Sequence, residues 1–283
     1  MLAVDHFRSA ALRAANDLPM LSAALQRALS LLAQGDDVSV AQLAGAVEQD
    51  VVIASSILSV ANSVMYTRTG KVASVRLAIA RLGIPKTRNM LLGLSVTRAF
   101  RKVHVTGGWS YTRFNAHSLA TAILADLLAR SVPAFYPEWA FMAGLMHEAG
   151  LLLIASAFPQ QFKAILAEAA SDFDLVRHEK SVFGFSHFEL GSELLGRWNF
   201  PPPVQHATTF CQSNTFEFTE PLTLGAVVKC ASLLADSHKI SIFDWNHEHT
   251  ITEELLEALQ VSRPADFLAE FESGYQELHI TAV

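Results

Sequence analysis

The sequence predicts an all-α fold, and three observations support this. Apolar residues recur three and four positions apart along most of the chain, which is the spacing of one face of a helix. Alternation of apolar and polar residues, the pattern of a half-buried strand, never extends beyond a few positions. With 283 residues, 51% of them apolar, the chain can bury the core of one large domain or of two compact lobes.

A lead-in helix is expected at residues 1–16, and five further helices are expected between there and residue 100. Their starts lie near Pro19, Ser39, Asp50, Ser74 and Pro85. Asp50 suits an N-cap because its side chain can accept hydrogen bonds from the free N–H groups of a first turn. Pro85 suits the first turn itself because its missing N–H is not needed there.

The pair Gly107-Gly108, in a stretch with few helix formers, marks the expected boundary between two lobes. Beyond it, Ser186 and Glu189 form a capping-box pattern, which makes His187 the first residue of a helix. Other helices are expected at 111–130, 139–162 and 222–235, followed by an amphipathic tail at 252–278. We expect the tail to close the second lobe, since such apolar stripes are normally core, and dimerisation is the alternative.

Charge and cysteine content exclude several classes of protein. The net charge is −6 and the basic residues are scattered, so the sequence has no electrostatic footprint for nucleic acid. Residues 1–17 carry charges throughout, which fits neither a signal peptide nor a membrane anchor. Cys211 and Cys230 fit no metal spacing and no disulfide framework, so we expect packed thiols in a reducing compartment. We therefore expect a cytoplasmic protein that binds neither nucleic acid nor membrane.

His147 and Glu148 are the only ionisable residues in the apolar stretch 139–162, which we expect to be one helix. The residues three, four and seven positions from His147 are small or apolar, so its imidazole points into a core. A buried carboxylate without compensation costs several kcal/mol, so Glu148 should find a metal, a cation or a hydrogen-bond donor. The pair indicates a site, or the remains of one.

His117 and His187 lie on the apolar stripes of two other expected helices. Imidazole nitrogens and a carboxylate are ligands that zinc, iron and manganese accept, so His117, His147, Glu148 and His187 could together hold one divalent ion. A lone inward histidine is more often an ordinary core residue. From the residues alone, the pocket could contain a metal, a His-Glu hydrogen-bonded pair or water. No Gly-rich phosphate loop, Gly-x-Ser-x-Gly elbow or His-Glu-x-x-His pair is present.

Seven short motifs follow one another in an order that resembles the HDOD family, an output domain related to the HD phosphohydrolases. They are LP at 18–19, ILSVANS at 57–63, AIARLG at 78–83, HSL at 117–119, GLMHEAG at 144–150, HFELG at 187–191 and WNFP at 198–201. The similarity covers about residues 17–212. It implies an N-terminal helical bundle lobe at 17–104, joined to a lobe at 105–283 that is similar to the HD and HD-GYP hydrolases.

The resemblance also assigns expected roles to the site residues. Catalytic HD proteins use a histidine, a His-Asp pair and a later aspartate to hold one or two metals that activate water against a phosphoester. His117 and His147 match the two histidines, and Glu148 stands where the aspartate would be. His187 matches the histidine that HD-GYP enzymes add.

Other ligands of the catalytic relatives are replaced. Their His-His pair falls on Phe210-Cys211, their last aspartate falls on Ser232, and the Gly-Tyr-Pro signature of cyclic-di-GMP phosphodiesterases is missing. The expected function is therefore a non-catalytic bacterial signalling module that contacts other signalling proteins. The alternatives are a phosphohydrolase that uses a single ion, acting on a nucleotide or phosphoester, and a metal or ligand sensor that uses the same pocket.

Overall fold

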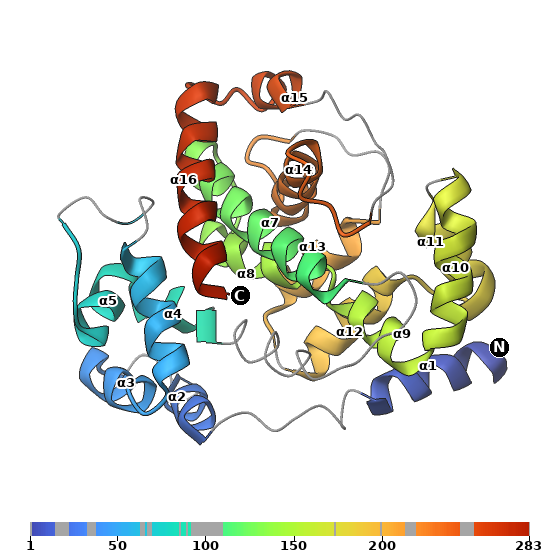
Figure 1. Ribbon diagram of the computed structural model, residues 1–283, viewed down its shortest axis with the longest axis horizontal. Coiled ribbons are helices and arrows are strands. Elements are labelled where there is room, and N and C mark those ends of the chain that lie inside the picture. Colours follow the sequence, from blue (N-terminus) through green and yellow to red (C-terminus); the bar gives the residue numbers. More distant parts are fainter. Residues whose placement is uncertain are drawn as a thin grey trace. The chain divides into compact units, whose positions relative to one another are not determined.

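A computed structural model of the chain consists of helices (Figure 1). The residues that the structure describes are 2–14, 23–32, 38–62, 66, 70–84, 86–88, 90–91, 110–172, 174–198, 200–212, 219–243 and 252–282. Among these residues the one extended pairing is an isolated bridge between Ala134 and Leu222. The predicted all-α fold class is confirmed.

The chain divides into two compact units. The larger unit comprises Met1–Leu18 and Phe100–Ser262, and the smaller unit comprises Pro19–Ala99 and Arg263–Val283. This grouping differs from the predicted lobes at both ends of the chain, because the first helix packs within the larger unit and the last helix within the smaller one. The expected boundary at Gly107-Gly108 lies outside the described residues.

The smaller unit is built from five described helices: α2 (Ala23–Leu32), α3 (Val40–Val47), α4 (Val51–Asn62), α5 (Val75–Leu82) and α16 (Pro264–Ala282). Asp50 caps α4, since its Oδ1 accepts hydrogen bonds from the backbone N–H groups of Val52 and Ile53. That predicted N-cap is confirmed, and Ser74 caps α5 in the same way. Most of the helix expected from Pro85 onward lies outside the described residues.

Helix α16 takes up much of the predicted amphipathic tail, and it packs against α4 within the smaller unit. Its Phe267 and Phe271 are buried, as expected for an apolar stripe that serves as core. The rest of the tail, α15 (Thr252–Ala258), packs against a helix of the larger unit. We expected the tail to close the second lobe, but its two helices belong to different units.

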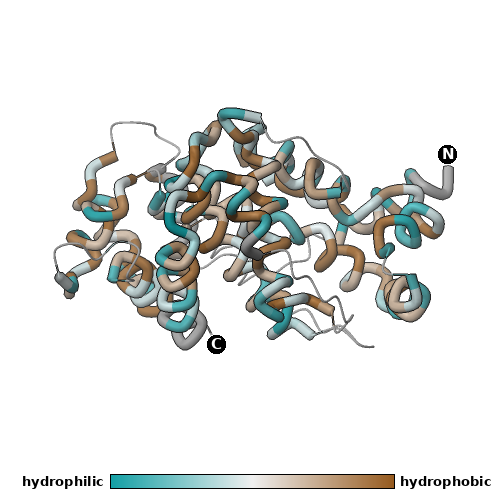
Figure 2. Tube along the Cα trace, turned by 90° about the horizontal axis from the view of Figure 1, so that it is seen from above, coloured by the Kyte–Doolittle hydropathy of each residue, from teal (hydrophilic) through white to brown (hydrophobic). Residues whose placement is uncertain are grey.

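The larger unit contains α1 (Leu2–Ala14), α7 (Tyr111–Ser131), the 3-10 helix η2 (Pro137–Trp139), α8 (Ala140–Met146), α9 (Ala149–Ala157), α10 (Pro159–Asp172), α11 (Leu175–Phe183), α12 (His187–Arg197), α13 (Pro202–Phe210), α14 (Leu224–Ser237) and α15. The middle of this unit is α7, which packs against α8 and α14 (Figure 1). Helix α12 packs against α9 and α13. Most helices carry both hydrophobic and hydrophilic residues, as expected for helices that bury one face (Figure 2).

The single helix expected over 139–162 is wrong. The structure breaks it twice, at His147-Glu148 between α8 and α9 and at Phe158 between α9 and α10. At the first break the backbone of Glu148 leaves the helical region, with φ −99° and ψ 10°, and its carbonyl accepts from Leu151 only three residues on. The ionisable pair therefore lies in a turn between two helices and not on the stripe of one.

One segment among the described residues, Pro137–Ala157, is long and apolar enough to cross a membrane by length and composition alone. Within the structure 83% of its most apolar window is buried among other helices, which is typical of a core segment. The turn at His147-Glu148 also interrupts it.

Candidate metal centre

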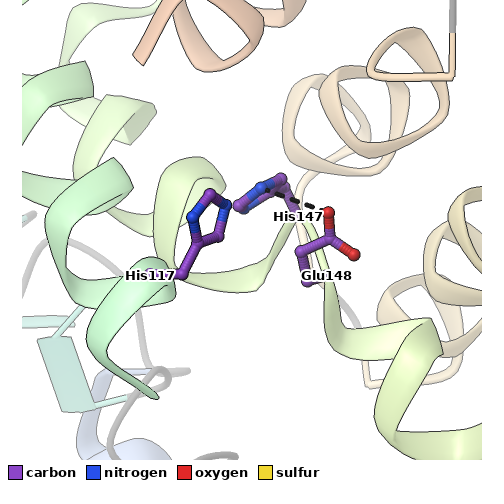
Figure 3. A group of neighbouring side chains, drawn as sticks. All are labelled: His117, His147 and Glu148. Carbon is purple, nitrogen blue, oxygen red and sulfur yellow. Dashed lines mark ion pairs between the residues drawn. The ribbon is translucent and has the colours of Figure 1, made fainter. Parts of the chain in front are cut away.

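Three of the predicted site residues meet inside the larger unit (Figure 3). His117 comes from the middle of α7, and His147 and Glu148 come from the turn between α8 and α9. One ligand atom of each residue lies within 4.8 Å of the other two. All three side chains are buried, with 2%, 1% and 8% exposure in that order.

Both histidines of this group present the same ring nitrogen to the pocket. Nδ1 of His147 lies 2.7 Å from the carbonyl oxygen of Gly144, and Nδ1 of His117 lies 2.8 Å from that of Ile240. A carbonyl can only accept, so Nδ1 carries the proton in each ring and Nε2 keeps a lone pair. Metal-binding histidines are normally held in this way, by a hydrogen bond from the nitrogen that does not bind the ion.

The two Nε2 atoms differ in what surrounds them. Nε2 of His117 lies 3.3 Å from the hydroxyl of Ser232 and 3.5 Å from that of Thr121. Nε2 of His147 has no hydrogen-bond partner among the described residues, and it faces Oε1 of Glu148 at 3.5 Å. Burial lowers the pKa of His147 to about 4, so at neutral pH its lone pair faces a carboxylate. A cation placed between them would satisfy both groups.

Glu148 is ionised in this pocket. Burial alone would raise its pKa, but the nearby rings of His187, His147 and His117 outweigh burial and hold the pKa well below its ordinary value. A buried carboxylate beside two imidazole nitrogens is a donor set that zinc, iron or manganese accepts. The residues present therefore fit a divalent ion.

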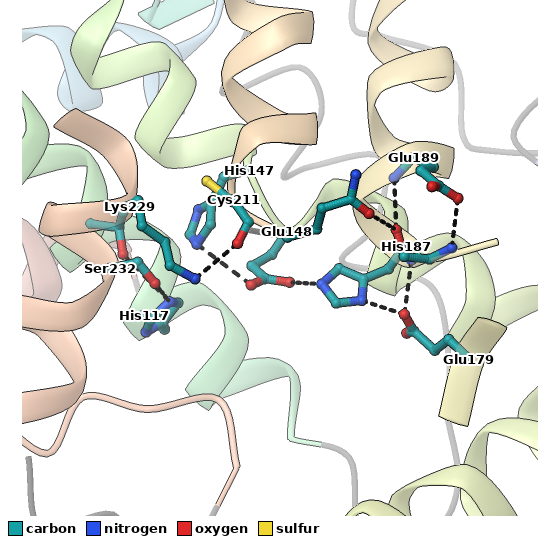
Figure 4. Close-up of polar contacts among 12 residues, drawn as sticks. His117, His147, Glu148, Glu179, His187, Glu189, Cys211, Lys229 and Ser232 are labelled. Carbon is teal, nitrogen blue, oxygen red and sulfur yellow. Dashed lines mark hydrogen bonds and ion pairs between the residues drawn. The ribbon is translucent and has the colours of Figure 1, made fainter. Parts of the chain in front are cut away.

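His187 lies on the far side of Glu148 from the other two histidines (Figure 4). Its Nε2 lies 3.1 Å from Oε2 of Glu148, and its Nδ1 lies 2.7 Å from Oε2 of Glu179. Burial alone would lower the pKa of His187, but the two carboxylates raise it to about 10. The ring is thus protonated at neutral pH and faces a carboxylate on each side. That His187 itself binds an ion stays a prediction.

The predicted local structure around His187 is confirmed. Ser186 and Glu189 form the capping box, in which the Ser186 hydroxyl accepts from the Glu189 N–H and the Glu189 carboxylate accepts from the Ser186 N–H. His187 is the first residue of α12. The capping box fixes the start of this helix, and with it the position from which the His187 ring projects.

Glu179 is the residue of this network that the sequence reasoning missed. It is fully buried on α11, in a polar stretch of the sequence for which we expect a connection that includes a partly exposed helix. A signal was present, because Leu175, Glu179 and Phe183 are spaced four apart and so share one face of a helix. All three are buried, so Glu179 is a carboxylate on an apolar stripe, the same pattern that drew attention to the histidines.

Helix α14 supplies another wall of the pocket. Lys229 donates a hydrogen bond from Nζ to the carbonyl oxygen of Cys211 at 2.9 Å, and Ser232 follows one turn later beside His117 (Figure 4). Cys211 and Cys230 are buried free thiols, as expected. Burial raises the pKa of each to about 12, so neither offers a thiolate.

Comparison with known proteins gives one curated relative and several solved structures. An uncharacterized protein of Treponema pallidum (strain Nichols) is 24% identical over 200 residues, which cover 69% of this chain and 37% of the relative. The chain therefore spans little more than a third of that relative's length.

Two solved structures illustrate the fold. A Shewanella amazonensis SB2B protein named as a candidate phosphohydrolase matches with a TM-score of 0.73 at 24% identity, covering 97% of this chain and 98% of its own. The response regulator MmoQ of Methylococcus capsulatus str. Bath matches with a TM-score of 0.50 at 25% identity, covering 87% of this chain and 95% of its own. The HDOD domain itself matches residues 18–213, more than half of the sequence, and the chain therefore belongs to the HDOD domain family.

Proposed function

We propose that the chain is a non-catalytic signalling module that contacts other signalling proteins and holds a single divalent ion in its larger unit. The observation that carries this proposal is the donor set of the pocket. One carboxylate, Glu148, lies with Nε2 of His147, which has no hydrogen-bond partner among the described residues, and with Nε2 of His117, which lies beside the hydroxyl of Ser232.

The ion would be zinc, iron or manganese, held by Nε2 of His117, Nε2 of His147 and a carboxylate oxygen of Glu148. When bound, such an ion can polarise an oxygen ligand or lower the pKa of a water molecule. The chain's own part is to fix the donors, which it does through the hydrogen bonds of the two imidazoles to Ile240 and Gly144.

Phosphoester cleavage by the two-metal route needs a bridging carboxylate and enough ligands for a second ion. Next to His117 this chain offers a hydroxyl, which is a poor ligand for a divalent ion compared with a carboxylate. Lys229 adds a positive charge on the same wall, one turn away on α14. Both features disfavour a second ion. The family relationship and a structural neighbour named as a response regulator support a signalling role.

A second candidate function is hydrolysis of a phosphoester by a single ion. Three protein ligands leave positions on the ion for water and substrate, as in mononuclear zinc hydrolases. The Shewanella neighbour named as a candidate phosphohydrolase points the same way. The pocket already supplies every protein ligand that hydrolysis by a single ion would need.

Metal content and turnover together distinguish these functions. Protein purified without an affinity tag or chelator is analysed for metals, wild type and His147→Ala side by side. Near-stoichiometric metal in the wild type alone supports the site, and no metal in either protein overturns it. The loaded wild type is then assayed on p-nitrophenyl phosphate and bis-p-nitrophenyl phosphate. We expect the wild type to cleave neither substrate faster than His147→Ala does. Metal-dependent cleavage by the wild type alone would establish the second candidate function.

The partner half of the proposal needs its own test. The immobilised full chain is used to capture proteins from extracts of the source cells, and each captured candidate is purified and titrated directly against the chain. We expect at least one protein with a receiver, sensor or kinase domain to bind. If no such protein binds in direct titration, the signalling role fails, whatever the metal content is.

A further inference from the structure

Glu179 is a fully buried carboxylate that contacts His187, and His187 in turn contacts Glu148 of the pocket. Its Oε2 accepts two hydrogen bonds from His187, one from the backbone N–H at 2.9 Å and one from Nδ1 at 2.7 Å. Its Oε1 has no hydrogen-bond partner among the described residues. A buried carboxylate satisfied at one oxygen only is costly to the fold, so packing alone is a poor account of its presence.

The two hydrogen bonds fix the direction of the His187 ring. One comes from the backbone of the first residue of α12 and the other from the ring of that residue, and both end on one oxygen atom. Rotation of the ring would break the second bond. With the ring held, Nε2 lies 3.1 Å from Oε2 of Glu148, which makes an ion pair although neither atom forms a hydrogen bond with a described residue. Figure 4 shows Glu179, His187 and Glu148 in this order, leading into the pocket.

With the His187 ring held in place, the two carboxylate oxygens of Glu148 face different histidines. Oε2 faces His187, and Oε1 faces Nε2 of His147 at 3.5 Å. A carboxylate whose second oxygen is paired with a positive charge in this way offers its other oxygen to an ion. Without His187 in place the group could rotate, offer both oxygens or turn away from the pocket.

We propose that Glu179 is a positioning residue of the pocket. By orienting His187 it keeps Oε2 of Glu148 in an ion pair and leaves Oε1 as the single oxygen donor beside the two imidazole nitrogens. The ligand class is one divalent cation that takes two nitrogens and one carboxylate oxygen. This inference rests on the metal site proposed above, and Glu179 itself does not touch the ion.

The test is a Co²⁺ titration of the full chain, because the visible absorption of Co²⁺ reports its coordination. We expect Glu179→Ala and His187→Gln each to weaken Co²⁺ binding by about 10–100-fold and to change the absorption spectrum. Glu179→Gln keeps an oxygen that can accept both hydrogen bonds, so it should stay within a few-fold of the wild type. Glu168→Gln is the control, because Glu168 is an exposed residue of α10 that contacts His178 and not the pocket.

A double variant separates positioning from a merely structural role. If Glu179 acts through His187, Glu179→Ala combined with His187→Gln binds Co²⁺ no more weakly than the weaker single variant. Additive losses, or a Glu179→Ala protein that melts earlier but keeps the wild-type affinity and spectrum, would overturn the inference. If Glu179→Ala does not fold, Glu179→Asp replaces it, since the shorter arm draws the carboxylate away from His187.

The outcomes for the two proposals are distinct. A wild type that binds no Co²⁺ overturns the metal site and the role of Glu179 together. If the wild type binds Co²⁺ and Glu179→Ala binds it with the same affinity, only the role of Glu179 is overturned and the metal site stays intact.

Discussion

Gly150 of α9 packs directly against the backbone of His187 at the start of α12. A Cβ added to Gly150 would overlap the carbonyl oxygen of His187 and would lie 2.6 Å from the backbone nitrogen of Gly191. These are backbone atoms, which cannot turn aside as a side chain can. The absence of a side chain at Gly150 therefore lets α9 and α12 approach closely, and this approach brings Glu148, at the start of α9, within reach of His187.

Gly150→Ala is expected to destabilise the protein by about 1–3 kcal/mol or more, because the two helices must separate to admit the methyl group. The free energy of unfolding from urea titration measures the effect. Gly45→Ala is the matched control: Gly45 also lies inside a helix, α3, but nothing lies within 4 Å of its added Cβ. There the change should be neutral, or stabilising by up to about 1 kcal/mol. Equal effects at both positions would refute the close-packing explanation.

The stability of the metal-free protein should fall as the pH rises above neutrality, because of His187. Its pKa is 6.5 unperturbed and about 10 in the folded protein, so between these values the folded state holds a proton that the unfolded state has lost. The contribution is complete below pH 6.5 and is lost as the pH rises through 10. The slope is at most about 1.4 kcal/mol per pH unit.

On the acid side of neutrality, His147 makes the stability change with pH in the opposite direction. Its pKa is about 4 in the folded protein, so between pH 6.5 and 4 the unfolded state binds the extra proton and stability falls as the pH falls. Unfolding in urea is measured at several pH values with a chelator present. The alkaline limb is followed only from pH 6.5 to 8.5, because above that range the two cysteines of the unfolded state, with an ordinary pKa of 9.0, also lose protons that the folded state keeps. His187→Gln should flatten this limb, and an unchanged slope would exclude His187 as its source.

Phe7 anchors α1 to the larger unit. Its ring lies 5.2 Å from that of Phe158 and 5.3 Å from that of Phe183 between centroids, edge-on to each. Phe7→Ala is expected to cost about 2 kcal/mol, less than a fully buried phenylalanine, because Phe7 is half-buried. Urea unfolding and the rate of proteolysis within α1 measure this. Ser9→Ala, at an exposed position of the same helix, should change neither quantity.

Much of the fold could be predicted because its signals are local. The capping box at Ser186 and Glu189 and the cap at Asp50 depend on side chains within three residues of the N–H groups they bind. The break at His147-Glu148 has no such signal, since neither residue disfavours a helix strongly. In the structure it accompanies a local hydrogen bond from the His147 ring to the carbonyl of Gly144 and a tertiary contact between Glu148 and His187.

The pocket could be predicted in part for a related reason. His117, His147 and Glu148 are each conspicuous on an apolar background, and a shared core is the place where such residues can meet. Glu179 escaped because its helix, α11, carries charged residues on its other faces, which mask the buried stripe. Which oxygen of Glu148 faces which histidine depends on the packing of α9 against α12, and no pattern in the sequence encodes that.

Replacing Ser232 tests whether one missing carboxylate limits the pocket. The hydroxyl of Ser232 lies 3.3 Å from Nε2 of His117, so an aspartate there would place a carboxylate next to an imidazole donor. We expect Ser232→Asp to bind Zn²⁺ or Mn²⁺ about tenfold more tightly than the wild type, in line with the 10–100-fold that single groups contribute around metal sites. Ser232→Asn has the same size without the charge, and it should not gain affinity.

If Ser232→Asp binds no more tightly than Ser232→Asn, the wall formed by α14 does not face the ion. If it gains affinity and also cleaves bis-p-nitrophenyl phosphate, which the wild type is expected to leave intact, then the hydroxyl at this position is what separates the binding module from a phosphohydrolase.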